Sequence, residues 1–125
     1  MSGKILLFGF EDLPSILSVG SVAQRFGVDM VPVQRADYSK TLGVLAGVTR
    51  AKSTPAPYSG TTLGGRMLVF CDLEAQLDDL LTAIRQAGIG PECLKAVLTA
   101  HNQNWTAVQL YGELHSEHQA MNRRR

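Results

Sequence analysis

A short segment in the second half of the chain gathers several side chains that can form hydrogen bonds. Thr99, His101 and Asn102 supply a hydroxyl, an imidazole and an amide, and Trp105 adds an indole. We expect a helix to begin directly after them, and the first backbone N–H groups of a helix have no partners within it. The segment therefore suits either a firmly anchored helix start or a site for an anion or a small molecule.

Two interpretations of this segment remain open. In the structural one, Asn102 or Asn104 accepts hydrogen bonds from the helix and Trp105 packs beneath the turn. In the functional one, Thr99, His101, Asn102 and Trp105 line a ligand pocket. We favour the structural interpretation and keep these side chains as the candidate ligand-binding residues.

Cys71 and Asp72 end an apolar run and are expected at the same edge of the sheet, so they are also candidate ligand-binding residues. A cysteine at a helix N-terminus can have a lowered pKa, so Cys71 is a candidate nucleophile with His101 as its base. We favour the alternative, in which Cys71 is a small buried side chain. Cys93 is expected at the opposite edge, so no disulfide with Cys71 is predicted and no residue is assigned as catalytic.

The last predicted helix carries residue types that bind metals, namely His115 and His118 with Glu113 and Glu117 nearby. No second cluster such as HExxH or CxxC completes a coordination shell. The sequence therefore predicts no metal site and no cofactor.

Composition excludes several classes of partner. The 125 residues are 45% hydrophobic and 18% charged, with a net charge of +1, so no basic excess would attract nucleic acid or a membrane surface. Phe8, Phe10 and Phe70 are the candidates for base stacking, but the basic and aromatic pattern of an RNA-recognition module is missing. The chain shows no membrane-spanning apolar run and no signal-peptide cleavage site, and its two cysteines lie in apolar segments. We predict a cytoplasmic protein.

Two segments of the chain resemble each other, residues 4–35 and residues 66–99. Each is predicted to form a strand, a helix and a second strand. The first strands, Ile5–Phe8 and Met67–Phe70, are apolar throughout, which is typical of strands buried on both faces.

The helices of these two units have predicted ends. Asp12 and Asp72 are expected to cap their starts, and Gly27 and Gly88 to end them. The apolar positions between follow helical spacing: Ile16, Val19, Ala23 and Phe26 in the first, and Leu77, Leu80, Leu81 and Ile84 in the second.

The second strand of each unit suits a sheet edge, because one contains Pro32 and the other Lys95. A duplicated βαβ unit with central first strands is the ferredoxin-like plait, with strand order 4-1-3-2. Right-handed crossovers then place both helices on one face. The predicted fold class is α+β, with an extra short helix between the halves and a C-terminal helix.

We expect residues 1–125 to form a single domain. Between the two units, residues 36–65 should form a short helix at Asp37–Gly47 and then a flexible loop from Arg50 to Gly65, rich in Pro, Gly, Ser and Thr.

Residues 100–125 should form a C-terminal helix from Asn104 to about Met121, followed by a tail. The central strands look apolar on both sides. One or both of the additional helices should therefore cover the second face of the sheet.

The second half of the chain resembles a family of short bacterial domains known as DUF3783, a domain of unknown function. The resemblance lies in MLVFCDLEAQLDDLLTAIRQAG, in LKAVLTAHNQNW and in the helix that follows to Glu113 and Glu117, and it extends to TLGVLAG at Thr41–Gly47. Between the Thr and Asn of the recurrent TxxNxxW, where a proline is usual, this chain has Ala and His. The resemblance implies no activity, ligand or cofactor.

These observations favour a non-enzymatic regulatory or binding module. The alternative is a small enzyme that uses the rim around Cys71 and the segment from Thr99 to Trp105. Ferredoxin-like folds often leave a sheet face or an edge strand for a partner, which is a fold analogy only. The expected partner is a second copy of the chain in a homodimer, or an unidentified small molecule or protein.

Overall fold

The computed structural model describes residues 3–50, 56–60 and 63–123, and side chains among them up to residue 117. Its sheet has four strands in the order β2-β1-β3-β4. The strands are β1 (Lys4–Phe8), β2 (Asp29–Pro32), β3 (Met67–Cys71) and β4 (Leu94–Val97).

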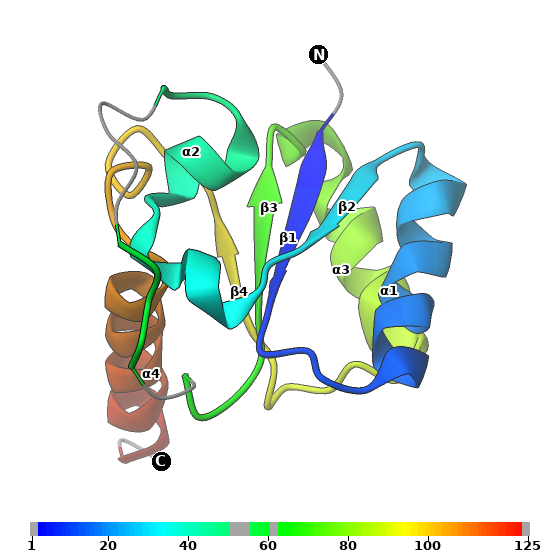
Figure 1. Ribbon diagram of the computed structural model, residues 1–125. Coiled ribbons are helices and arrows are strands. Elements are labelled where there is room, and N and C mark those ends of the chain that lie inside the picture. Colours follow the sequence, from blue (N-terminus) through cyan, green and yellow to red (C-terminus); the bar gives the residue numbers. More distant parts are fainter. Residues whose placement is uncertain (1–2, 51–55, 61–62, 124–125) are drawn as a thin grey trace.

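Helices cover both faces of this sheet, so the molecule has three layers (Figure 1). The helical elements are α1 (Leu13–Phe26), the 3₁₀ turn η1 (Arg35–Ser39), α2 (Leu42–Ala46), the 3₁₀ turn η2 (Glu74–Gln76), α3 (Leu77–Gln86) and α4 (Ala107–Arg123). α1 and α3 pack on one face, as the right-handed crossovers predict, while η1, α2 and α4 lie on the other.

The predicted ferredoxin-like plait is wrong in its strand order. β1 and β3 are central and antiparallel, and β2 and β4 lie at the edges, but each edge strand pairs in parallel with the first strand of its own unit. In the order 4-1-3-2, β2 would form a hairpin with β3. The long connection from Val33 to Arg66 carries η1 and α2 across the second face instead, so no hairpin ties β2 to β3.

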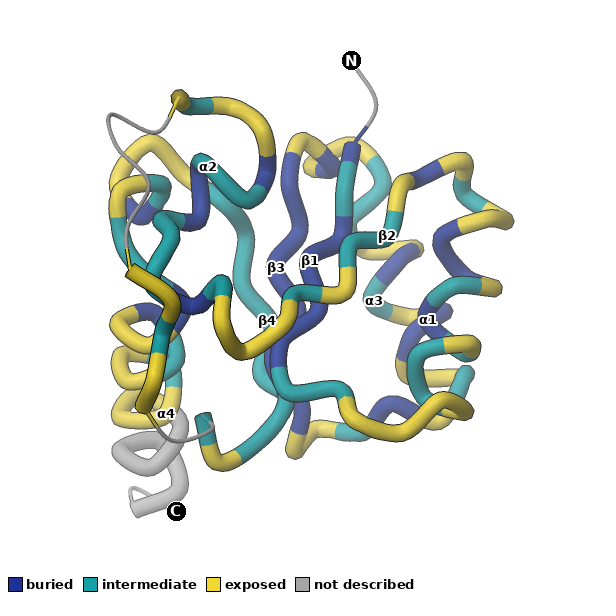
Figure 2. Tube along the Cα trace, in the orientation of Figure 1, coloured by how far each residue is buried: buried dark blue, intermediate teal, exposed yellow. Residues whose placement is uncertain are grey.

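The two central strands have no polar face. In β1, Ile5 and Leu7 contact the α1 and α3 side while Leu6 and Phe8 contact the other, and all four side chains are buried. Every residue of β3 is buried as well, and in β1 only Lys4 is partly exposed, so Figure 2 shows β3 and the rest of β1 dark blue. This two-sided burial confirms the prediction that additional helices cover the second face.

Of the two predicted N-terminal helix caps, one is confirmed and the other is wrong. The Asp12 carboxylate accepts a hydrogen bond from Ser15 N at 2.9 Å, and Gly27 ends α1 in the left-handed conformation. Asp72 caps nothing: it is exposed with φ at 58°, and the 3₁₀ turn η2 separates it from the first residue of α3 at Leu77.

The segment between the two units also differs from the prediction. The single helix expected at Asp37–Gly47 is η1 followed by α2, and the helix breaks where Thr41 becomes the cap of α2 and accepts from Val44 N. Part of the expected flexible loop packs on η1, because Tyr58 N donates to Ala36 O and the Tyr58 ring lies 5.7 Å from that of Tyr38. Residues 51–55 and 61–62 of that loop lie outside the described residues.

Among residues 3–50, 56–60 and 63–123, no helix is both long enough and apolar enough to cross a membrane.

Candidate functional site

The structure brings the predicted site residues to one edge of the sheet. Cys71 ends β3, and the segment from Thr99 to Trp105 follows β4, the parallel neighbour of β3. Phe70 pairs with Val97, so the two chain segments leave the sheet side by side. The prediction that these residues share an edge is therefore confirmed, although the strand order on which it was based is not.

Asn102 holds the segment from Thr99 to Trp105, which we call the Thr99–Trp105 loop, in a closed hydrogen-bonded turn. Its Oδ1 accepts from Thr99 N at 2.8 Å, its Nδ2 donates to Val97 O at 3.0 Å, and its backbone N donates to Thr99 Oγ1 at 3.1 Å. The side chain is buried, with 8% exposed. Its amide is thus committed to the protein's own backbone.

The Thr99–Trp105 loop is also the support on which α2 rests. Leu42 N donates to Trp105 O and Gly43 N to Gln103 O, both at 2.8 Å, so the first turn of α2 finds its acceptors in this loop. A Cβ on Gly43 would lie 3.0 Å from Gln103 O, which explains why a glycine stands there. The Trp105 side chain packs half-buried on the same hydrophobic cluster as α2 and α4.

The start of α4 does not use the predicted asparagine caps. Thr106 N donates to Gln109 Oε1 at 2.9 Å, and Gln109 N donates to Thr106 Oγ1 at 3.3 Å. This reciprocal pair is a capping box, and the signal for it, Thr-x-x-Gln, stands in the sequence just after Trp105. Neither Asn102 nor Asn104 caps the helix.

Cys71 does not have the properties of a nucleophile. Its side chain is 3% exposed and contacts the cluster under α2 and α4. Burial raises the pKa of the Cys71 thiol to about 11, and the Lys4 ammonium only partly opposes this. The thiol is therefore protonated at neutral pH, and the exposed His101 ring lies instead against Trp105, with 5.1 Å between ring centroids.

The second cysteine and the His and Glu side chains of α4 form no alternative reactive centre among the described residues. Cys93 precedes β4, at the end of the sheet opposite Cys71, and both thiols are free. His115 stacks on Tyr111 with 5.8 Å between ring centroids, and the side chain of His118 lies outside the described ones. Within the described part of the chain, no group of three His, Cys, Asp or Glu side chains is placed to hold a metal ion.

A cavity that the sequence prediction missed lies at the other edge of the sheet, where β1 and β2 end. We call it the strand-end hollow. It has a volume of about 430 Å³, within the size range of small-molecule sites. Its lining comes from the last residue of β2 and from the segments that follow the two strands: Gly9, Phe10, Glu11, Pro32, Val33, Gln34, Arg35 and Tyr38.

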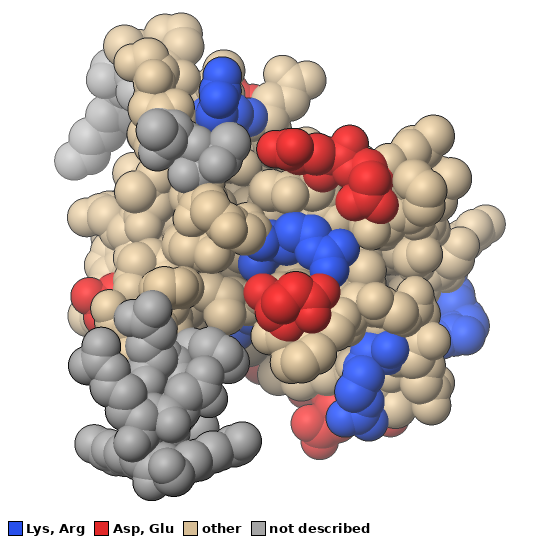
Figure 3. Space-filling view, turned by 90° about the horizontal axis from the view of Figure 1, so that it is seen from below, with Lys and Arg blue, Asp and Glu red and all other residues tan. Residues whose placement is uncertain are grey.

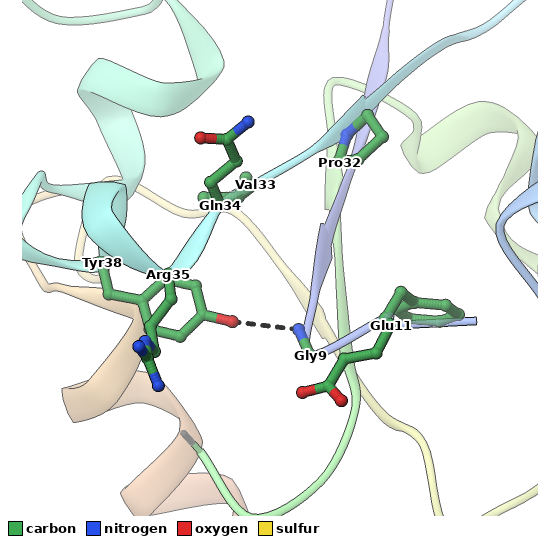
Figure 4. A pocket seen from close by; sticks show the side chains of 8 residues that line it. Gly9, Glu11, Pro32, Val33, Gln34, Arg35 and Tyr38 are labelled. Atoms are coloured by element: carbon green, nitrogen blue, oxygen red, sulfur yellow. Dashed lines mark hydrogen bonds between the residues drawn. The ribbon is translucent and has the colours of Figure 1, made fainter. Parts of the chain in front are cut away.

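Tyr38 and Gly9 form the inner wall of the hollow. Gly9 N donates to the Tyr38 hydroxyl oxygen at 3.0 Å, which joins η1 to the segment after β1 (Figure 4). Gly9 has φ at 76°, and a Cβ there would lie 2.3 Å from Gly65 O, so the position requires glycine. This wall is therefore fixed by backbone geometry.

Two opposite charges lie on the two sides of the hollow. Figure 4 shows the Arg35 guanidinium and the Glu11 carboxylate on its two sides, with the Tyr38 hydroxyl between. Both side chains are exposed, and among the described residues neither forms an ion pair. Burial raises the pKa of Tyr38, and the negative charge of Glu11 raises it further, whereas the Gly9 N–H and Arg35 act in the opposite sense.

Arg66 fixes the position of Phe10, the aromatic ring on one side of the hollow. Its guanidinium lies 5.1 Å from the centroid of the Phe10 ring, donates to Ser15 Oγ at 3.2 Å and pairs with Glu92. Figure 3 views this end of the molecule and shows basic and acidic groups interleaved on its surface. The contacts of Arg66 tie the β1–α1 connection to the α3–β4 connection.

One signal in the sequence could have found the hollow. Ligand sites in open α/β sheets lie beyond the carboxyl ends of parallel strands. The rule covers the strand pair β1 and β2, and Gly9–Glu11 and Gln34–Arg35 follow these two strands. The combination of glycine, carboxylate and guanidinium was present there.

The fold and these two regions define a three-layer α/β module built from two βαβ units. Residues 66–121 match the model of the family described as Domain of unknown function (DUF3783). This confirms the resemblance seen in the second half of the sequence. The match includes the Thr99–Trp105 loop but not Thr41–Gly47, whose resemblance stays a prediction, as does a bacterial origin.

No curated protein and no solved structure matches the chain. The residues that line the strand-end hollow lie outside the matched segment, while Arg66, which holds Phe10, is its first residue. The proposed function therefore depends on the geometry at the two ends of the sheet, where the strand pairs β1–β2 and β3–β4 terminate.

Proposed function

We propose that the protein is a non-enzymatic binding module that takes a small polar molecule into the strand-end hollow. The observation that carries this proposal is the pair of opposite charges, Arg35 and Glu11, which lie on opposite sides of a cavity without pairing with each other (Figure 4). Charged groups converging on a cavity at the carboxyl ends of parallel strands are the usual arrangement of a ligand site.

The chemistry of the lining favours binding over catalysis. A general base works best with a pKa near the operating pH, and the pKa of Tyr38 is raised above its already high ordinary value. Its hydroxyl therefore acts as a hydrogen-bonding group. The candidate nucleophile of the alternative enzyme, Cys71, is a buried thiol with a raised pKa at the other sheet edge.

The position of the segments that the hollow joins supports a regulatory role. Glu11 belongs to the β1–α1 connection and Arg35 to η1, and a ligand bound to both would link these two segments more firmly than the Gly9–Tyr38 hydrogen bond does alone. The two free cysteines suit a reducing compartment, which supports the cytoplasmic location that we propose.

Titration of the ¹⁵N-labelled chain with a library of cytoplasmic metabolites tests this function. We expect at least one compound to shift the Gly9 and Gln34 amide resonances saturably, and Arg35→Ala to weaken its binding. The matched control is Arg85→Ala, which removes another exposed arginine, in the last turn of α3, and should leave the binding unchanged. If no compound shifts these resonances, or both variants bind alike, the proposal is wrong.

A further inference from the structure

We infer that the ligand of the strand-end hollow is a zwitterion, an amino acid or a molecule with the same pair of charges, with its carboxylate on Arg35 and its ammonium on Glu11. This inference rests on the proposed binding function and adds the chemical class of the ligand. It follows from the signs of the two charges and from the groups between them.

Arg35 is suited to the carboxylate of such a ligand. A guanidinium presents its N–H donors in a planar fork that matches the two oxygens of a carboxylate. Arg35 is the first residue of η1, and among the described residues no acid pairs with it. Gln34 precedes it in the chain and also lines the hollow, but Figure 4 shows its amide pointing away from Arg35, so the guanidinium is the group assigned to the carboxylate.

Glu11 is suited to the ammonium group. An ionised carboxylate only accepts hydrogen bonds, and an ammonium offers three donors. In Figure 4 the Glu11 carboxylate faces the side of the hollow on which Arg35 stands, yet the two do not pair. A ligand between them would satisfy both charges at once.

The groups between the two charges complete the site. The Tyr38 oxygen already accepts from Gly9 N, and its own O–H has no acceptor among the described residues, so it can donate to a ligand oxygen. Phe10, Pro32 and Val33 provide apolar surface on which the remainder of a ligand can rest. The hollow thus contains one cationic, one anionic, one hydroxyl and one apolar contact.

Selectivity against singly charged molecules is the consequence. A ligand that has only a carboxylate would place a second negative charge near Glu11 and give Glu11 no partner. A ligand that has only an amine would likewise place a positive charge near Arg35 and give Arg35 no partner. Removing either ligand charge should therefore weaken binding by at least about tenfold, a loss typical of one charged hydrogen bond.

The test compares free amino acids with their blocked forms. The probes are a mixture of the standard amino acids, then the binding members singly, then their N-acetyl and carboxamide derivatives, and a dipeptide with more widely separated charges. The readout is the Gly9 amide shift of the ¹⁵N-labelled chain. We expect saturable shifts with free amino acids, and at least about tenfold weaker binding of both blocked forms. Dipeptide binding that is tighter than that of the amino acids would identify a peptide-like zwitterion.

Charge-neutralising variants assign each end of the ligand. Arg35→Gln should lose the preference for a free carboxylate, and Glu11→Gln the preference for a free amine, while Arg85→Gln keeps both. Well-dispersed amide spectra of all three variants show that the fold is intact.

Equal binding of blocked and free forms, or binding only of metabolites with one charge, would overturn the inference while leaving the binding function in place. Absence of any binding metabolite would overturn both.

Discussion

The Thr99–Trp105 loop and the strand-end hollow occupy corresponding places in the two βαβ units, each beyond the carboxyl ends of a parallel strand pair. In the loop, the side-chain amide of Asn102 forms hydrogen bonds with the backbone of Thr99 and Val97. In the hollow, Glu11 and Arg35 form no ion pair with any residue that the structure describes. The same position in the topology is thus filled by the protein's own backbone in one unit and left open in the other.

The difference between the two regions follows from side-chain length and charge. Thr and Asn are short, and their side chains readily bond to the backbone of their own turn. Glu and Arg reach beyond their own turn, and their charges favour contact with water or a charged partner. Because of this, polar residues alone do not identify a site in this chain.

The largest expected effect comes from replacing Gly9, which forms the wall of the hollow. Gly9→Ala should lower the free energy of unfolding by about 3 kcal/mol or more, because a Cβ at φ 76° would meet Gly65 O at 2.3 Å. The control is Gly27→Ala, with φ 68° and no atom within 4 Å, which should cost only about 1 to 2 kcal/mol. Equal losses in urea denaturation would show that the wall is not rigid.

Asn102→Ala should break the Thr99–Trp105 loop at a cost of about 2 to 4 kcal/mol. The change leaves Thr99 N and Val97 O without their partners in a half-buried turn. Asn104→Ala, at an exposed position in the same loop, should change the free energy of unfolding by less than about 0.5 kcal/mol. Similar changes in the free energy of unfolding for both variants would show that the Asn102 hydrogen bonds do not stabilise the loop.

Alkaline pH should destabilise the chain through its two buried thiols. Cys71 and Cys93 have pKa values raised from 9.0 to about 11 by burial. Between these pH values the folded state binds more protons than the unfolded state, so stability is complete below pH 9 and falls as the pH rises toward 11.

The expected loss in the free energy of unfolding is on the order of 2 kcal/mol per thiol. In Cys71→Ala, the part of this pH-dependent loss that comes from Cys71 should disappear. Urea denaturation across this pH range measures it. Ultraviolet absorbance can detect the thiolate. If the Cys71 thiolate forms near neutral pH, the region around Cys71 and the Thr99–Trp105 loop would again be a candidate reactive site.

The smallest expected effect on stability comes from the charges of the hollow. Arg35→Ala and Glu11→Ala should each change the free energy of unfolding by less than about 0.5 kcal/mol, because both side chains are exposed and form no ion pair within the described part of the chain. Thermal unfolding measures this. A large loss in either variant would mean that the two charges serve the fold rather than a ligand.

Much of the fold could be predicted from local sequence signals. The apolar runs at β1 and β3 and the cap at Asp12 indicated two βαβ units, and Pro32 and Lys95 indicated which strands lie at the edges. The strand order could not be predicted in this way, because it depends on where the connection between the units crosses the sheet. Both orders satisfy the same hydrophobic pattern.

The candidate site was harder to predict than the fold. Thr99, Asn102 and Trp105 are close in sequence, so their side chains formed a visible motif, although ligand binding there stays a prediction. Glu11 and Arg35 are far apart in sequence, and only the direct pairing of β1 with β2 brings them together. The predicted homodimer and the single domain also stay predictions, which sedimentation and proteolysis can test.

The short edges of the sheet have a consequence for the behaviour of the protein at high concentration. Exposed strand edges recruit further strands, and this is the first step toward cross-β fibrils. β2 has four residues and ends in Pro32, which has no N–H to donate, and β4 is equally short and has α4 packed against it. Neither edge offers a long ladder of free backbone groups, so the architecture opposes edge-to-edge polymerisation of the folded chain.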